Sequence, residues 1–322
     1  MSRIDYSAFA LEGFKITLFC LGIIGLLKLF GAANEFLLIP FNMAVMSAAA
    51  TFSVSKKNLA QVSLGSSVVV ISTILGGVLG FYYPWLASLI TIIYAGLAFY
   101  LPKTKSKTNI FVTGSLMFLI FSALPFSLQA GIKYAFVGAV VVVAFTLFYW
   151  LFEYRKDANN TKPEPTQANF FMALATISSL TLAWIISHYL RACSTLSHLY
   201  WIGLTILMVI QGSQQRTIYT AIKRIAINTF GAIIVVFLFG YIVPPNFWIN
   251  FILLVIFLFL IFSLGFSYFL RVFFIELFVF GFAHLLGDYH NVVALDRIIL
   301  TCIGGLIVIT VTLMLYWIKV DV

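Results

Sequence analysis

Residues 246–265 read NFWINFILLVIFLFLIFSLG, a stretch without a single charged side chain. A helix needs about 20 mainly apolar residues to cross the hydrocarbon core of a bilayer. The stretch therefore predicts a transmembrane helix. Comparable apolar runs, separated by charged or turn-forming residues, recur along the rest of the chain. Together they predict an all-α integral membrane protein.

The composition of the whole chain supports this class. Of its 322 residues, 62% are hydrophobic and 9% are charged, whereas about 25% are charged in an ordinary soluble domain. Too few polar side chains are present to cover a water-facing surface, which excludes a soluble enzyme or nucleic-acid-binding domain. The sequence contains no Walker-type glycine loop. We therefore expect a protein without catalytic activity or cofactor, whose lipid bilayer is its main partner.

About twelve transmembrane helices are expected from the positions of the apolar runs. The candidate spans are 14–32, 36–53, 62–82, 85–101, 110–127, 131–152, 170–190, 198–213, 220–241, 246–265, 268–287 and 292–318. With the N-terminus placed inside, most of the 19 Lys and Arg residues fall on the inner side. This predicts a bacterial inner-membrane protein with both termini in the cytoplasm. It also explains the net charge of +9 without a nucleic-acid partner.

A polar linker over residues 155–169 divides the chain into a first membrane half, 1–154, and a second, 170–322. The sequence GFYYP at 80–84 has a counterpart, GYIVP, at 240–244. Because each half holds an even number of expected spans, the halves point the same way. We expect two parallel six-helix repeats, with a site near the membrane midplane between them.

The second half contains a distinctive set of motifs: Trp-x-x-Leu-Thr from Trp201, Gln-Gly-Ser from Gln211, and Arg-x-x-x-Asn-Thr-x-Gly-Ala from Arg224. A fainter echo, Ala-x-x-Arg-x-x-x-Thr-x-x-Gly, begins at Ala294. This pattern resembles the fusaric acid resistance or aromatic acid exporter family of bacterial inner-membrane proteins. The chain departs from that pattern at Gly212, where proline is usual, and at Asn228, where glycine is usual.

The resemblance is to a reduced, membrane-only member of the family. It implies efflux of organic anions, in particular aromatic carboxylic acids, often alongside a periplasmic membrane-fusion adaptor. It also adds Gln211 and Thr229 to the residues expected to bind substrate. Assembly into a homo-oligomer stays open.

Polar residues within the apolar runs are the candidates for function. Arg224, Asn228 and Gly231 are spaced to share one helical face. A guanidinium followed one turn later by an amide suits the capture of a carboxylate. The alternative is that Arg224 anchors the helix at the lipid headgroups. Arg297, Lys28 and Asn42 are secondary candidates, although a lysine near a helix end can also reach the interface.

Glu276 is the one acidic residue well inside an apolar run, where ionisable groups often serve ion or proton pathways. His284 lies on the same helical face, so the two are expected to couple transport to protons. The alternative is a structural pair with Arg271 or with another helix. Asp288, His290 and Asp296 are expected in one outer loop, with a spacing that matches no metal site we recognise.

Three functions follow as hypotheses. The first is an inner-membrane exporter of organic anions that binds substrate through Arg224. The second is a passive organic-anion channel, because no energy-coupling domain is evident. The third is a scaffold subunit that holds an adaptor protein in an efflux complex.

Overall fold

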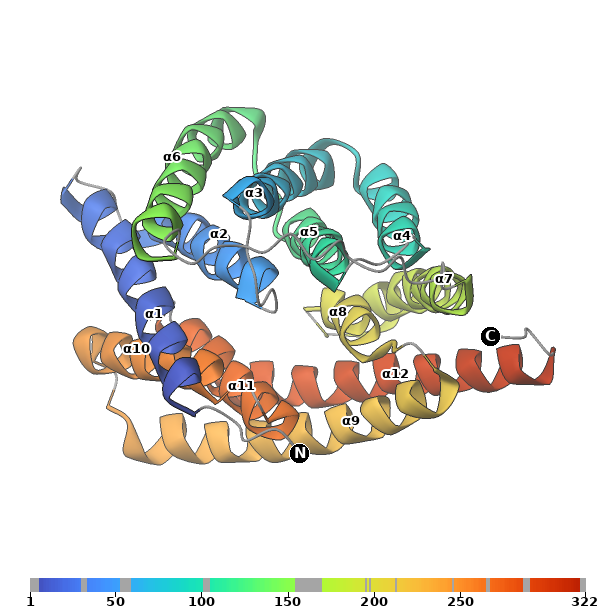
Figure 1. Cartoon of the computed structure of the whole chain (residues 1–322). Helices are drawn as coiled ribbons and strands as arrows, with labels where there is room; N and C mark the ends of the chain where they lie inside the picture. The colour runs from blue at the N-terminus through green and yellow to red at the C-terminus, as the bar shows by residue number, and fades with distance from the viewer. Residues whose placement is uncertain are drawn as a thin grey trace. The chain divides into compact units, whose positions relative to one another are not determined.

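The computed structural model describes residues 6–29, 34–52, 59–100, 105–153 and 170–318, except 195, 197, 212, 245, 265–266 and 286–289. Within these ranges every regular element is a helix (Figure 1). The helices are α1 (Tyr6–Leu29), α2 (Asn34–Phe52), α3 (Leu59–Tyr82), α4 (Pro84–Tyr100), α5 (Lys105–Ala123), α6 (Leu128–Glu153), α7 (Phe170–Cys193), α8 (Tyr200–Val209), α9 (Gln214–Phe237) with its π-helical extension η1 (Leu238–Ile242), α10 (Phe247–Ser263), α11 (Tyr268–Leu285) and α12 (His290–Trp317).

Each apolar run that predicts a span coincides with one of these α-helices, which confirms the all-α class. Six helices are long and apolar enough to cross a bilayer, namely those containing Phe9–Leu29, Leu59–Tyr82, Leu128–Leu151, Phe170–Cys193, Gln214–Ile242 and Val293–Trp317. By contrast, α8 has only 10 residues and rises about 15 Å, half of a hydrocarbon core. The expected count of twelve spans and the parallel repeat therefore stay predictions. The linker at 155–169 lies outside the described residues.

The chain forms two compact units, one of residues 1–18 and 185–313 and the other of 19–184 and 314–322. In the second, α3 lies between α2, α4, α5 and α6 and contacts all of them. Glycines make its closest approach possible. A Cβ on Gly76 would lie 2.5 Å from the backbone oxygen of Phe118, and a Cβ on Gly80 would lie 2.3 Å from that of Ser122. Small residues of this kind let membrane helices pack backbone to backbone.

The first unit contains α8, α9, α10, α11 and most of α12. Here α11 packs on both α9 and α10. Helices α9 and α12 run antiparallel (Figure 1), since Gly305 of α12 lies against Ile225 of α9, and Thr301 lies against Asn228 further along α9. On another face of α12, Gly304 lies against the Ile202 backbone of α8. Helix α12 is therefore held between α8 and α9, where the polar residues of the second half meet.

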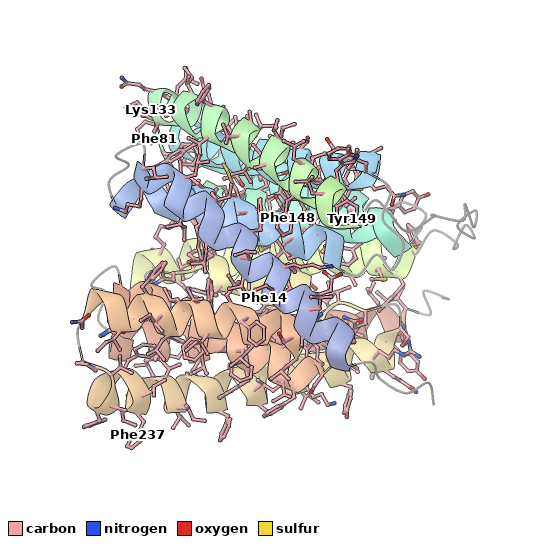
Figure 2. All side chains as sticks on the ribbon, turned by 60° about the vertical axis from the view of Figure 1, so that its left-hand side comes forward. Phe14, Phe81, Lys133, Phe148, Tyr149 and Phe237 are labelled. Carbon is pink, nitrogen blue, oxygen red and sulfur yellow. The ribbon has the colours of Figure 1, made fainter. Side chains whose placement is uncertain are left out.

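Large apolar side chains are exposed on the helices of both units, as a bilayer-embedded protein requires. Phe14, Phe81 and Phe237 are examples, each more than half exposed and each standing out from its own helix (Figure 2). In water such side chains would be costly to leave uncovered. Their exposure agrees with lipid as the surrounding medium.

Candidate anion-binding site

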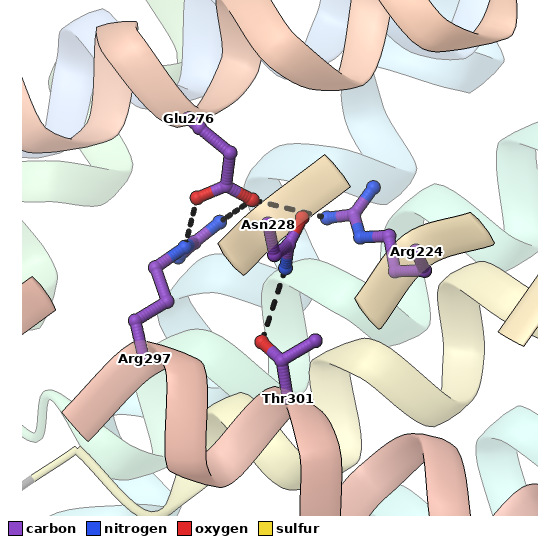
Figure 3. Close-up of polar contacts among 5 residues, drawn as sticks. All are labelled: Arg224, Asn228, Glu276, Arg297 and Thr301. Atoms are coloured by element: carbon purple, nitrogen blue, oxygen red, sulfur yellow. Dashed lines mark hydrogen bonds and ion pairs between the residues drawn. The ribbon is translucent and has the colours of Figure 1, made fainter. Parts of the chain in front are cut away.

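Three ionisable side chains from three helices meet inside the first unit: Arg224 from α9, Glu276 from α11 and Arg297 from α12 (Figure 3). Their exposed fractions are 2%, 0% and 1%. Glu276 stands near the middle of α11, so the cluster lies deep within an apolar element. Two guanidinium groups and one carboxylate give the cluster a formal charge of +1, because arginine keeps its charge in proteins.

Arg297 and Glu276 form a two-pronged ion pair. The Nη2 of Arg297 donates to Glu276 Oε1 at 2.7 Å, and its Nε donates to Glu276 Oε2. This is the fork arrangement in which guanidinium and carboxylate bind most strongly. Gly231 of α9 makes room for the carboxylate, since a Cβ there would lie 3.2 Å from Glu276 Cβ.

Arg224 is held much more loosely. Its Nη2 lies 3.9 Å from Glu276 Oε1, which is an ion pair without a hydrogen bond. Both its Nε and its Nη2 are buried and have no hydrogen-bond partner among the described residues. These are the same two nitrogens that Arg297 uses to bind Glu276. Arg224 thus presents, unbonded, the edge that recognises a carboxylate.

An amide and a hydroxyl separate the two arginines. Asn228 of α9 donates from Nδ2 to Thr301 Oγ1 of α12 at 3.0 Å, and Asn228 Oδ1 has no hydrogen-bond partner among the described residues. Each arginine lies four residues before its own helix's member of this pair, about 6 Å along the axis. Because α9 and α12 are antiparallel, Arg224 and Arg297 lie on opposite sides of the Asn228–Thr301 contact.

Aromatic side chains cover the Arg297 end of the cluster. The guanidinium carbon of Arg297 lies 3.5 Å from the centre of the Trp201 ring, and 5.7 Å from that of Phe280. Tyr200 stacks on Trp201 with 5.1 Å between ring centres. Stacked aromatic rings of this kind attract a guanidinium and leave its N–H edge free for an anion. Trp201 Nε1 is also buried without a hydrogen-bond partner among the described residues.

The other substrate-binding candidates are placed differently. Gln211 is in the turn between α8 and α9, where its backbone N–H and C=O both bond the Thr217 hydroxyl. Thr229 is half-buried, next to Asn228 on α9. Lys28 is exposed near the end of α1, and Asn42 is half-buried in α2, so both belong to the other compact unit.

Glu276 and His284 share α11, but the structure gives them separate neighbours. Glu276 binds Arg297 and faces Arg224, whereas the half-buried His284 ring lies 5.2 Å from the ring of Phe239. The partner of Glu276 is therefore on another helix, as one of the two sequence interpretations expects. That partner is Arg297 of α12, and not Arg271 of the same helix. The predicted proton-coupling role of Glu276 and His284 stays a prediction.

The expected outer loop with three polar residues is partly wrong. Asp296 lies within α12, 5% exposed, and its Oδ2 is 3.8 Å from Nδ1 of His198. His290 is the first residue of α12, and Asp288 lies outside the described residues. The helix begins at His290, close to the start of the expected span at 292, so Asp296 belongs to the span and not to the loop before it. In the part of the chain that the structure describes, no group of three potential metal ligands occurs.

Sequence reasoning does not place Trp201, Phe280 or Thr301 in the site. Trp201 and Thr301 lie within the sequence motifs of the second half. Their spacing in these motifs is the signal that could have placed them in the site. Arg224, Asn228 and Gly231 of α9 repeat at the same intervals as Arg297, Thr301 and Gly304 of α12. This repeated spacing on α9 and α12 is the sequence pattern that could have predicted that these residues lie together. Phe280 carries no comparable signal, because phenylalanine is common along the whole chain.

The segment that contains the cluster matches a known protein family. Residues 182–311 match the model of a family described as fusaric acid resistance protein-like. This segment is similar to that family. It contains the cluster and all the motifs on which the resemblance rests, so the predicted resemblance to this family is confirmed. No curated protein and no solved structure matches the chain. With the six long apolar helices, the family indicates a multi-pass membrane protein of the transport or efflux type.

Proposed function

We propose that the protein carries small organic anions across the membrane and that Arg224 binds the anion. The observation that supports this most directly is the unbonded Nε–Nη2 edge of Arg224, buried in a cluster of formal charge +1. A buried cation that lacks acceptors is costly, since it loses hydration without compensation. A carboxylate on this edge would supply two acceptors and neutralise the cluster.

Aromatic carboxylic acids are the substrate class we favour. The family is described by resistance to fusaric acid, which is itself a pyridine carboxylic acid. The Trp201 and Phe280 rings beside Arg297 offer apolar surface next to the charged groups. A substrate with one ring and one carboxylate would satisfy both features.

A carrier fits the geometry better than a pore that stays open. Arg224, Glu276 and Arg297 are all 2% exposed or less, so the described residues cover the cluster and keep it out of contact with water. Export toward the periplasm, coupling to protons through Glu276 and His284, and work with a membrane-fusion adaptor belong to the same proposal. Collapse of the proton gradient tests the coupling, because a coupled exporter would then stop accumulating substrate against a gradient.

Export from cells tests the proposed function. Cells that produce the wild type, Arg224→Ala or no protein are loaded with benzoate, salicylate and 4-hydroxybenzoate, and the retained acid is measured. We expect the wild type to lower retention of at least one acid and Arg224→Ala to lose that effect. Lys223→Ala is the matched control, because Lys223 is the exposed neighbour of Arg224 and contacts the Tyr219 ring. Equal retention in wild-type and empty cells for all three acids would refute the proposal.

A further inference from the structure

The Nε–Nη2 edge of the guanidinium group is hydrogen-bonded in one arginine of the cluster and not in the other. Arg297 uses Nε and Nη2 to hold the carboxylate of Glu276, whereas these nitrogens of Arg224 have no hydrogen-bond partner among the described residues. The Glu276 carboxylate lies between them, with Oε1 bonded to Arg297 and 3.9 Å from Arg224. One side chain of the protein thus occupies one of two equivalent carboxylate sites.

We propose that Glu276 is an internal substitute for the transported anion, and that it occupies one arginine while a monovalent organic anion occupies the other. This inference rests on the proposed function and specifies how its site works. With Glu276 on Arg297, Arg224 binds the anion, and the charges of these three side chains and the anion sum to zero. When Glu276 turns to Arg224, the anion is left with Arg297. When the Glu276 carboxylate and the anion exchange arginines, only hydrogen bonds and ion pairs break and form.

The positions of the arginines give this exchange a direction across the membrane. Arg224 and Arg297 lie on opposite sides of the Asn228–Thr301 contact, because their helices are antiparallel. An anion passed from one to the other therefore advances along the helix axes. The loose 3.9 Å pair between Glu276 and Arg224 is the contact through which the carboxylate changes partner.

The Glu276 carboxylate also helps the substrate anion to leave the arginines. Two buried guanidinium groups alone would carry a formal charge of +2 and would hold anions firmly, since Coulomb attraction is strong in a medium of low dielectric constant. Transport requires a substrate to bind and also to leave. Glu276 competes for the same edges and so weakens the hold of either arginine on the substrate.

The number of anions bound per chain can be measured. The number of anions bound per chain should equal the number of cluster arginines minus the number of cluster carboxylates. Binding of radiolabelled benzoate to the full-length protein in lipid nanodiscs gives this number at saturation. We expect one benzoate for the wild type, two for Glu276→Gln, and a loss of binding for Arg224→Gln and for Arg297→Gln.

The double variants give the decisive result. Arg224→Gln/Glu276→Gln and Arg297→Gln/Glu276→Gln each keep one arginine and the buried charge of the wild type. We expect each to regain one benzoate, although each carries an additional substitution. If the residues only supported the fold, the second substitution would not restore binding. The double variants also keep the test valid if Glu276→Gln, with its charge of +2, does not fold.

The possible results separate a failure of the inference from a failure of the proposed function. Lys223→Gln is the control and should bind one benzoate, as the wild type does. One bound benzoate in Glu276→Gln, or none in both folded double variants, overturns the inference and leaves the proposed function intact. An absence of benzoate binding in the wild type and in every variant overturns both. Elution as a single species in size-exclusion chromatography establishes that a variant is folded.

Discussion

At the scale of single residues, anion binding depends on the position of the Glu276 carboxylate, and the Glu276 side chain packs against Gly231. A Cβ at residue 231 would lie 3.2 Å from Glu276 Cβ and 3.3 Å from Glu276 Cγ. We expect Gly231→Val to push Glu276 away from Arg297 and to reduce benzoate binding severalfold, with the protein still present in the membrane. Gly22→Val is the control, because a Cβ there meets nothing within 4 Å. Equal binding in the two valine variants would show that this packing does not position Glu276.

At the scale of helices, the sequence predicts far more than it does at the scale of contacts. Apolar runs between charged or proline-containing breaks locate every α-helix to within several residues, because the bilayer demands long apolar helices. The spacing of Arg224, Asn228 and Gly231 correctly predicts one shared face. It does not predict that Glu276 binds Arg297, because residues 21 positions apart are joined only by tertiary packing. A pairing of Glu276 with His284 follows from helical periodicity alone, which carries no information about the next helix.

The shortness of α8 also cannot be predicted from its sequence, because that sequence is as apolar as the sequence of a membrane span.

At the scale of the whole molecule, the orientation in the membrane is the prediction that a native residue can test. The distribution of positive charges predicts that the N-terminus lies inside, so α7 should run outward and end at the periplasmic face. Its last residue, Cys193, is exposed, whereas Cys20 is buried. We expect a membrane-impermeant maleimide to label Cys193 in intact spheroplasts and Cys193→Ser to remove the label. Labelling of Cys193 only after the membrane is opened would reverse the predicted orientation, while the site itself would be unaffected.

The proposed transport depends on binding of an organic carboxylate to the buried Nε–Nη2 edge of Arg224. A crystal structure with 4-bromobenzoate tests it most directly, because bromine can be located by its anomalous scattering. We expect the carboxylate of the probe on Arg224, with Glu276 still bound to Arg297, and no ordered probe at this position in Arg224→Gln. A probe ordered elsewhere in the protein, with the Arg224 edge unliganded at saturating concentration, would contradict it.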